Sequence, residues 1–131
     1  MQMPISIKNI SSLEAYKLLG MDKCTIVVDV RTTEEWQKIG IPKLDKDQVL
    51  FLSWRLLPDM SLNHEFNNQF ISKVRNKNNV LFLCRSGVRS HEAASCAGGL
   101  GYPNCYNIID GFEGGDNGAG WKQNNLPWQV L

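Results

Sequence analysis

One short segment of the chain, residues 84–90, combines a nucleophile with groups that bind anions. It carries a thiol, two guanidinium groups, two hydroxyls and a glycine, in the order Cys84, Arg85, Ser86, Gly87, Val88, Arg89, Ser90. The segment follows an apolar run and precedes helix-forming residues, so we expect a turn between a strand and a helix. Backbone N–H groups in such a turn bind anions and stabilise a thiolate. The pattern therefore predicts an activated cysteine, Cys84, in an anion-binding loop.

The remaining residues of this loop are predicted to bind the substrate. Arg85 and Arg89 offer permanent charge and paired hydrogen bonds to an anion with several oxygens. Gly87 permits a tight backbone path that a side chain would obstruct. The predicted substrate-binding residues are Arg85, Ser86, Gly87, Val88, Arg89 and Ser90.

The other cysteines and the two histidines have no comparable surroundings. Cys24, Cys96 and Cys105 lie outside any such loop, and we interpret them as small packing residues with reduced thiols. The spacing contains no Cys-x-x-Cys pair and no histidine at ligand distance, so neither a metal site nor a cofactor is expected. His91, just beyond the loop, is expected to be exposed on a helix, with electrostatic assistance to the cysteine as the alternative. His64 is expected in a polar loop.

Composition limits the classes of protein that fit. The chain has 131 residues, a net charge of +1 and 43% hydrophobic residues. This size predicts a single domain over residues 1–131. No basic block indicates a nucleic-acid or membrane-surface partner, and no apolar run would span a bilayer. The N-terminus lacks the features of a signal peptide, which predicts a cytoplasmic protein; oligomeric state is left open.

Strand and helix patterns alternate along the chain. Strands are expected at residues 5–7, 24–30, 48–54, 80–83 and 106–109. Helices are expected from 11 to 20, from 32 to 39, from 65 to 75 and from 88 to 100, the first two opened by capping boxes. Residues 58–63 are expected to form a loop. The alternation predicts an α/β fold with a mostly parallel five-stranded sheet and helices on both faces. Asp29 and Cys84 fall at carboxyl ends of strands, where such sheets bind ligands.

The glycine-rich segment 111–120 has a composition found in phosphate- and calcium-binding loops. It lacks the Lys-Ser/Thr ending of a phosphate loop and the acidic spacing of a calcium loop. We therefore expect a flexible turn.

Residues 84–90 resemble the active-site loop of the rhodanese family. The resemblance extends to further segments, which are Asp29-Val30-Arg31 with Glu35-Trp36, Gly40-Ile41-Pro42, and Gly114-Gly115 with Trp121 and Leu126-Pro127. It covers residues 7–127, nearly the whole chain. Two departures are the missing histidine of the family's Gly-His-Ile-Pro segment and extra residues between Gly115 and Trp121.

The resemblance implies a rhodanese-like domain that transfers sulfur by double displacement. Cys84 would take the outer sulfur of a small anionic donor such as thiosulfate and pass it, as a persulfide, to cyanide or a thiol. Arg85 and Arg89 would hold the oxyanion end of the donor. Asp29 would tie down the loop by hydrogen bonds, and Arg31 would form an ion pair with a nearby carboxylate.

Two alternatives remain open from the sequence. Phosphatases and arsenate reductases of the same fold use Cys-x5-Arg, a longer loop around a tetrahedral oxyanion. Here Arg89 follows Cys84 after four residues, and Ser90 stands where the phosphatase arginine would be. The second alternative is a non-catalytic rhodanese-like binding module, which the intact loop disfavours.

Overall fold

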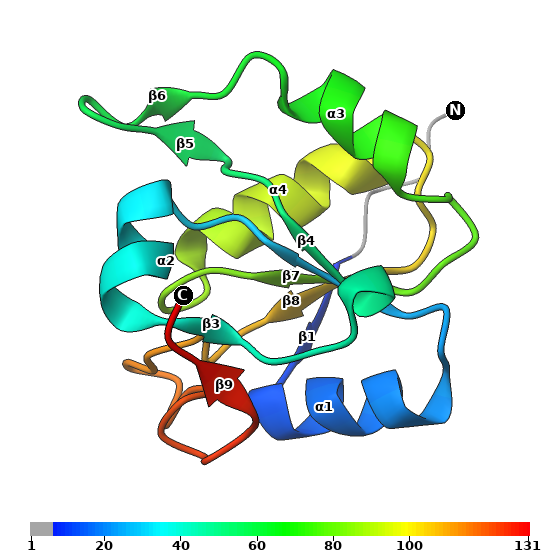
Figure 1. The fold of residues 1–131 in the computed structure, drawn as a ribbon. Helices are drawn as coiled ribbons and strands as arrows, with labels where there is room; N and C mark the ends of the chain where they lie inside the picture. Colours follow the sequence, from blue (N-terminus) through cyan, green and yellow to red (C-terminus); the bar gives the residue numbers. More distant parts are fainter. Residues whose placement is uncertain (1–6) are drawn as a thin grey trace.

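A five-stranded parallel sheet forms the centre of the molecule in the computed structural model, which describes residues 7–131 (Figure 1). Its strand order is β1-β8-β7-β2-β4, and each neighbouring pair is parallel. The strands are Lys8–Ile10 (β1), Ile26–Asp29 (β2), Val49–Phe51 (β4), Val80–Leu83 (β7) and Cys105–Ile108 (β8). The predicted α/β fold with a parallel five-stranded sheet is confirmed.

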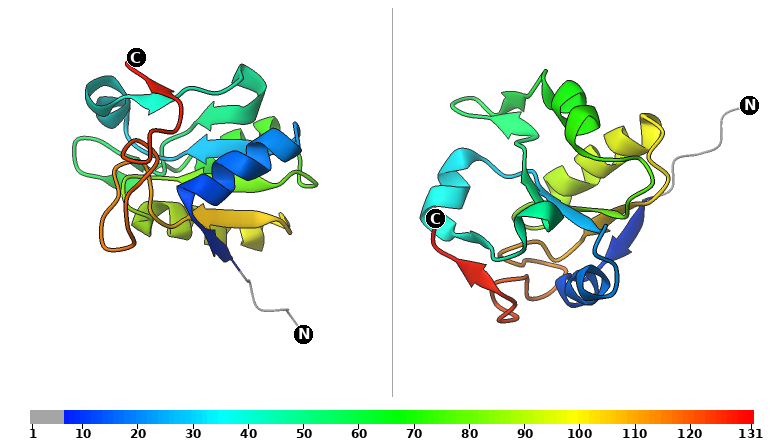
Figure 2. Two further views of the ribbon diagram at one scale, coloured as in Figure 1. Left: turned by 90° about the horizontal axis from the view of Figure 1, so that it is seen from below. Right: turned by 45° about the vertical axis from the view of Figure 1, so that its right-hand side comes forward.

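Helices cover both faces of this sheet, as predicted. They are Ser12–Met21 (α1), Thr33–Ile39 (α2), Phe66–Lys73 (α3) and Val88–Gly99 (α4). Helix α1 packs on one face, α3 and α4 pack on the other, and α2 lies beyond the ends of the strands (Figures 1 and 2). Both predicted capping boxes are present: Ser11 with Glu14 opens α1, and Thr32 with Glu35 opens α2.

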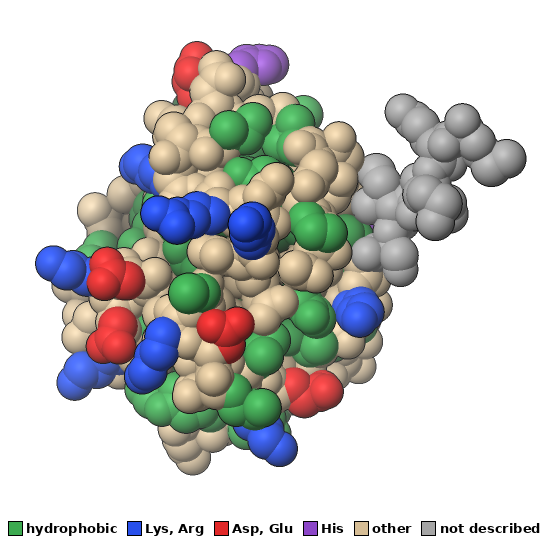
Figure 3. All heavy atoms as spheres, turned by 90° about the vertical axis from the view of Figure 1, so that its right-hand side faces the viewer, with side chains coloured by type: hydrophobic (Ala, Val, Ile, Leu, Met, Phe, Trp, Pro, Cys, Tyr) green, Lys and Arg blue, Asp and Glu red, His purple; other side chains and the backbone are tan. Residues whose placement is uncertain are grey.

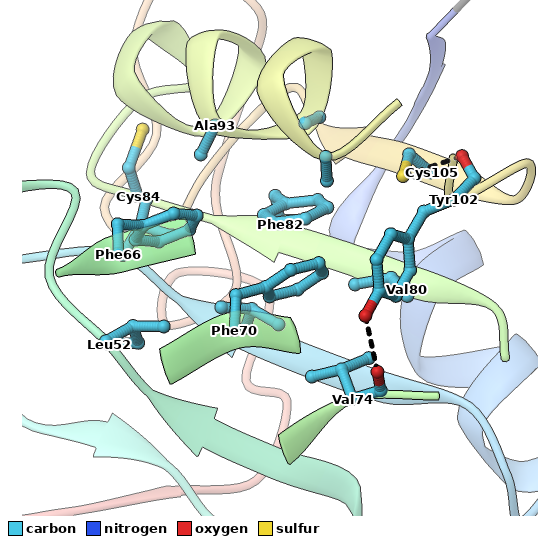
Figure 4. Close-up of a cluster of buried hydrophobic side chains, with 14 residues drawn as sticks. Leu52, Phe66, Phe70, Val74, Val80, Phe82, Cys84, Ala93, Tyr102 and Cys105 are labelled. Carbon is cyan, nitrogen blue, oxygen red and sulfur yellow. Dashed lines mark hydrogen bonds between the residues drawn. The ribbon is translucent and has the colours of Figure 1, made fainter. Parts of the chain in front are cut away.

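The central strands are apolar on both faces because both faces are covered. All four residues of β7 are buried. Leu81 and Leu83 pack with α1 on one side, whereas Phe82 packs with α3 and α4 on the other. Cys84 continues this alternation, so its side chain points toward α4, near Ala93 (Figure 4).

Several predicted boundaries were wrong. Residues 5 and 6 of the first predicted strand lie outside the described residues, and the strand itself is Lys8–Ile10. The predicted strand 48–54 shortens to Val49–Phe51, preceded by a 3-10 turn at Lys46–Gln48. Two short antiparallel pairs were not predicted, namely Ile41–Pro42 (β3) with Trp128–Gln129 (β9) and Arg55–Leu56 (β5) with Ser61–Leu62 (β6). Strands of two residues show no detectable periodicity, so only the folded chain reveals them.

The sheet order brings Cys84 and Asp29 to the same edge. Strands β2 and β7 are neighbours, and Asp29 is in register with Leu83, the residue before Cys84. Figure 3 shows the opposite end of the molecule, where acidic and basic side chains are interspersed without a continuous basic band. None of the helices within residues 7–131 is long and apolar enough to cross a membrane.

Candidate active site

Cys84 lies directly after β7, at the start of the turn that leads into α4. Cys84 is only 1% exposed, so its sulfur lies beneath the loop rather than on the surface. The Gly87 N–H donates to Sγ at 3.1 Å, and Ser90 Oγ lies 3.2 Å from Sγ. Gly87 is the residue that immediately precedes α4, so the sulfur also faces the positive end of that helix. The predicted strand–turn–helix setting of Cys84 is therefore present.

Glycine at position 87 is required by both conformation and space. Its φ is +101°, and a Cβ there would collide with the Ile109 carbonyl oxygen. The segment after β8 also holds the other side of the loop, because the Phe112 N–H donates to the Cys84 carbonyl at 2.9 Å and the Glu113 N–H to the Arg85 carbonyl at 3.0 Å. These backbone contacts on both sides therefore fix the conformation of the Cys84 loop.

The two loop arginines have different environments. Arg89 forms a two-pronged ion pair with Glu35 of α2, with N–O distances of 2.7 and 2.9 Å. The Arg85 side chain is 66% exposed, and its Nε lies 3.4 Å from Glu113. Both were predicted to hold the donor's oxyanion. The structure shows the Arg89 guanidinium bound to a carboxylate that links α4 to α2. Donor binding by either arginine stays a prediction.

The Arg89 ion pair also affects ionisation. Burial alone would raise the pKa of Glu35, but hydrogen bonds from Arg89 and Thr32 outweigh burial and hold that pKa below its usual range. The same hydrogen bond to Glu35 raises the pKa of Arg89. Both groups are therefore charged at neutral pH.

Asp29 and Arg31 form a second ion pair, entirely buried beneath the site. Arg31 Nη2 lies 2.8 Å from Asp29 Oδ2, and both side chains are 0% exposed. The predicted pairing of Arg31 with a carboxylate is present. The predicted hydrogen bonds from the Cys84 loop to Asp29 are not, because Arg31 folds back and occupies the carboxylate with its backbone N–H, Nε and Nη2. The link to the loop is indirect: Arg31 lies 4.2 Å over the Phe112 ring, and the Phe112 N–H binds the Cys84 carbonyl.

Asn107 is a site residue that the sequence analysis missed. It lies on β8, is 2% exposed, and its Oδ1 is 2.5 Å from Ser90 Oγ. Its Nδ2 donates to the Gly87 carbonyl and to Asn9 Oδ1, each at 3.1 Å. The signal that could have found it is an amide side chain inside the expected strand 106–109, because a buried amide needs hydrogen-bond partners.

A hollow of about 440 Å³ lies beside the loop. Helix α2, the turn between β5 and β6, and the loop surround it, with Thr32, Glu34, Glu35, Lys38, Ile39, Leu57, Met60, Arg85, Arg89 and Glu113 as its lining. Three acids and three bases in this lining balance in charge. The hollow reaches the loop at its arginines, and Cys84 itself is not part of the lining.

A model of the Rhodanese-like domain matches residues 11–117, most of the chain. The chain belongs to the rhodanese-like family. A Rickettsia conorii protein, "Uncharacterized protein RC0915", is 52% identical over 95% of this chain and 99% of its own length. The crystal structure of Rv0390 from M. tuberculosis superposes with a TM-score of 0.85 at 33% identity, covering 96% of this chain and all of that one. The polysulfide-sulfur transferase homodimer of Wolinella succinogenes shares the fold, with a TM-score of 0.70 at 21% identity over 94% of this chain and 78% of that one.

The glycine-rich segment 111–120, which contains the extra residues, begins against the Cys84 loop, where Phe112 and Glu113 donate to its carbonyls. The segment forms a turn closed by hydrogen bonds between Gly115 and Gly118.

In the part of the chain that the structure describes, the histidines and cysteines do not cluster around a metal site. His64 and His91 are both exposed. All four cysteines are free thiols. Within residues 7–131 no group of three or more His, Cys, Asp or Glu side chains is placed to hold a metal ion.

Proposed function

We propose that this rhodanese-like protein is a sulfurtransferase that carries sulfane sulfur as a persulfide on Cys84. The observation that carries the proposal is the position of the Cys84 sulfur, which receives the Gly87 N–H and faces the N-terminus of α4. Donors fixed around a sulfur stabilise the negative charge that it bears as a thiolate or a persulfide. The protein needs no cofactor for this chemistry.

The reaction has two displacement steps. The Cys84 thiolate attacks the outer sulfur of thiosulfate, a Cys84 S–S bond forms, the donor's S–S bond breaks, and sulfite leaves with the bonding electron pair. A thiolate or cyanide then attacks the outer sulfur of the persulfide. The acceptor keeps that sulfur, and Cys84 returns to the thiolate.

The residues of the Cys84 loop have separate roles toward the sulfur donor. Arg85 is exposed at the rim of the hollow and is the guanidinium that we assign to the donor's oxyanion end. The loop residues Ser86, Gly87, Val88 and Ser90 would surround the transferred sulfur, while Arg89 holds the loop through Glu35. The Asp29–Arg31 pair supports the loop from below. We place the protein in the cytosol, where thiols are kept reduced.

Steady-state kinetics with thiosulfate and cyanide test this function. We expect parallel double-reciprocal lines, because a covalent intermediate separates the two substrates. Cys84→Ser should abolish turnover, and Cys24→Ser, which changes an exposed thiol, should retain it. Polysulfide is a second donor to test, since the Wolinella relative is named for it.

The outcomes distinguish the alternatives. Turnover by Cys84→Ser equal to wild type would contradict the mechanism. Hydrolysis of a phosphoester without thiosulfate turnover would favour the phosphatase. A wild-type protein inert toward every sulfane donor would favour a binding module.

A further inference from the structure

The Ser90 hydroxyl is part of a closed ring of hydrogen bonds around the Cys84 sulfur. From Sγ the ring passes to the Gly87 N–H, from the Gly87 carbonyl to Asn107 Nδ2, and from Asn107 Oδ1 through Ser90 Oγ back to Sγ. Ser90 is fully buried and Asn107 nearly so. Every polar atom in the ring therefore depends on its protein partners.

The Gly87 carbonyl fixes the orientation of the Asn107 amide. A backbone carbonyl only accepts, so the amide edge that faces it, 3.1 Å away, must be the NH₂ group. The second N–H of that group donates to Asn9 Oδ1. Asn107 Oδ1 must then face Ser90, and an amide oxygen only accepts. The Ser90 hydroxyl is consequently the donor in the 2.5 Å contact with Asn107.

This orientation decides the direction of the contact between Ser90 and Cys84. Ser90 has one hydroxyl proton, and Asn107 holds it. Toward Sγ, 3.2 Å away, Ser90 then presents only a lone pair, which accepts from a protonated thiol. A thiolate at Cys84 would face that lone pair unless Ser90 released Asn107, leaving a buried amide oxygen without a donor.

We propose that Asn107 is a positioning residue that holds the Ser90 hydroxyl proton, so that Ser90 presents a lone pair to Cys84 and opposes the thiolate that the Gly87 N–H and α4 stabilise. In the wild type this lone pair opposes ionisation of the sulfur until the Ser90 hydroxyl turns from Asn107 to Sγ. The inference rests on the proposed function only in taking Cys84 as the reacting thiol. It assigns Ser90 the opposite role from a hydroxyl that simply stabilises the thiolate.

The charged groups around the sulfur are the same in every protein that this test compares. Arg89 on α4 and its partner Glu35 on α2 lie on one side, and the buried Asp29–Arg31 pair lies at the end of β2. From the segment after β8, Glu113 pairs with Arg85. Changes confined to Ser90 and Asn107 leave all of these charges in place.

The decisive variant is Asn107→Leu, similar in size but without an amide. In this variant the Gly87 carbonyl still accepts the hydrogen bond from the His91 N–H of α4, at 3.4 Å, so it keeps one donor. Ser90 becomes free to donate to Sγ. We expect the fraction of Cys84 present as thiolate below its titration midpoint to rise about tenfold, the gain from one hydrogen bond to a charged group. Far-ultraviolet thiolate absorbance against pH measures it, after subtraction of the same titration of Cys84→Ser.

Ser90→Ala supplies both the control and a second test. Adding Asn107→Leu to Ser90→Ala should change the thiolate fraction of Cys84 no further, since the effect requires the hydroxyl. Ser90→Ala alone should also raise the thiolate fraction, a result that stands even if Asn107→Leu does not fold. A lower thiolate fraction in Ser90→Ala, or an Asn107→Leu effect that persists in the Ser90→Ala background, would overturn the inference. The absorbance requires no turnover, so its outcome is independent of whether the protein transfers sulfur.

Discussion

At the residue scale, the two arginines of the Cys84 loop have separate tasks. Arg89 is held by Glu35, whereas Arg85 extends into solvent beside Glu113. A guanidinium already bound to a carboxylate on both prongs has little left to offer an incoming anion. An arginine near the reactive sulfur therefore does not bind the sulfur-donor substrate merely because of its position.

Replacing each arginine by methionine separates these tasks. Arg89→Met should lower the free energy of unfolding by about 1 to 2 kcal/mol, since the pair is only partly screened by solvent. It should also lower kcat/KM for charged and neutral sulfane donors alike. Arg85→Met should leave stability unchanged and raise KM for thiosulfate alone. Urea denaturation and kinetics with thiosulfate and a neutral organic polysulfide measure these effects. The assignment fails if Arg89→Met spares the neutral donor.

The sequence predicted the residues of the loop but not all their partners. Cys84, Gly87 and Ser90 follow from local spacing, because a turn between strand and helix is a local structure. The partners Glu35 and Asn107 are far away in the chain, and only the packing of α2 and β8 brings them to the loop. An ion pair or a buried amide contact between distant segments leaves no local pattern.

At the element scale, the first turn of α2 both caps its own helix and binds the Cys84 loop. Glu35 closes the capping box with Thr32 and also binds Arg89 of α4. The capping box was predicted from its local spacing, whereas its connection to the loop was not. The short pairs β3–β9 and β5–β6 were missed for a related reason, since their partners are set by the path of the whole chain.

The shared role of Glu35 predicts a pH dependence of stability. Because hydrogen bonds hold the pKa of Glu35 below its usual range, its contribution is fully present above the pKa of the unfolded chain and is lost as pH falls through the lower folded value. Wild type should exceed Glu35→Gln in free energy of unfolding by about 1 kcal/mol at neutral pH, and the difference should close below about pH 4.

Urea denaturation over a pH series measures this difference. Glu34→Gln is the matched control: Glu34 is exposed on the same helix, and its partner is the exposed Lys38. It should have little effect at any pH. A Glu35→Gln difference that stays constant into acid would refute the assignment.

At the scale of the whole molecule, the sheet order creates the site. Adjacent β2 and β7 end at one edge, where the buried Asp29–Arg31 pair lies beneath the segment that holds Cys84. Alternating strand and helix patterns predicted this edge, because parallel strands end together. The burial of the pair was not predictable, since Phe112, whose ring lies 4.2 Å from Arg31, comes from a distant segment of the chain.

Breaking this pair should be costly. Asp29→Asn leaves the buried Arg31 charge without its counter-charge and should lower the free energy of unfolding by about 3 to 5 kcal/mol. Asp29→Leu combined with Arg31→Met removes both charges and should recover much of that loss. Chemical denaturation of the three proteins measures these changes. Equal stability of Asp29→Asn and wild type would contradict the buried ion pair.

The most direct measurement is the intact mass of the protein before and after thiosulfate. We expect the wild type to gain the mass of one sulfur atom and to lose it again on addition of cyanide. Cys84→Ser should gain nothing, while Cys24→Ser should behave like wild type. An unchanged wild-type mass, or the same gain in Cys84→Ser, would contradict a persulfide on Cys84.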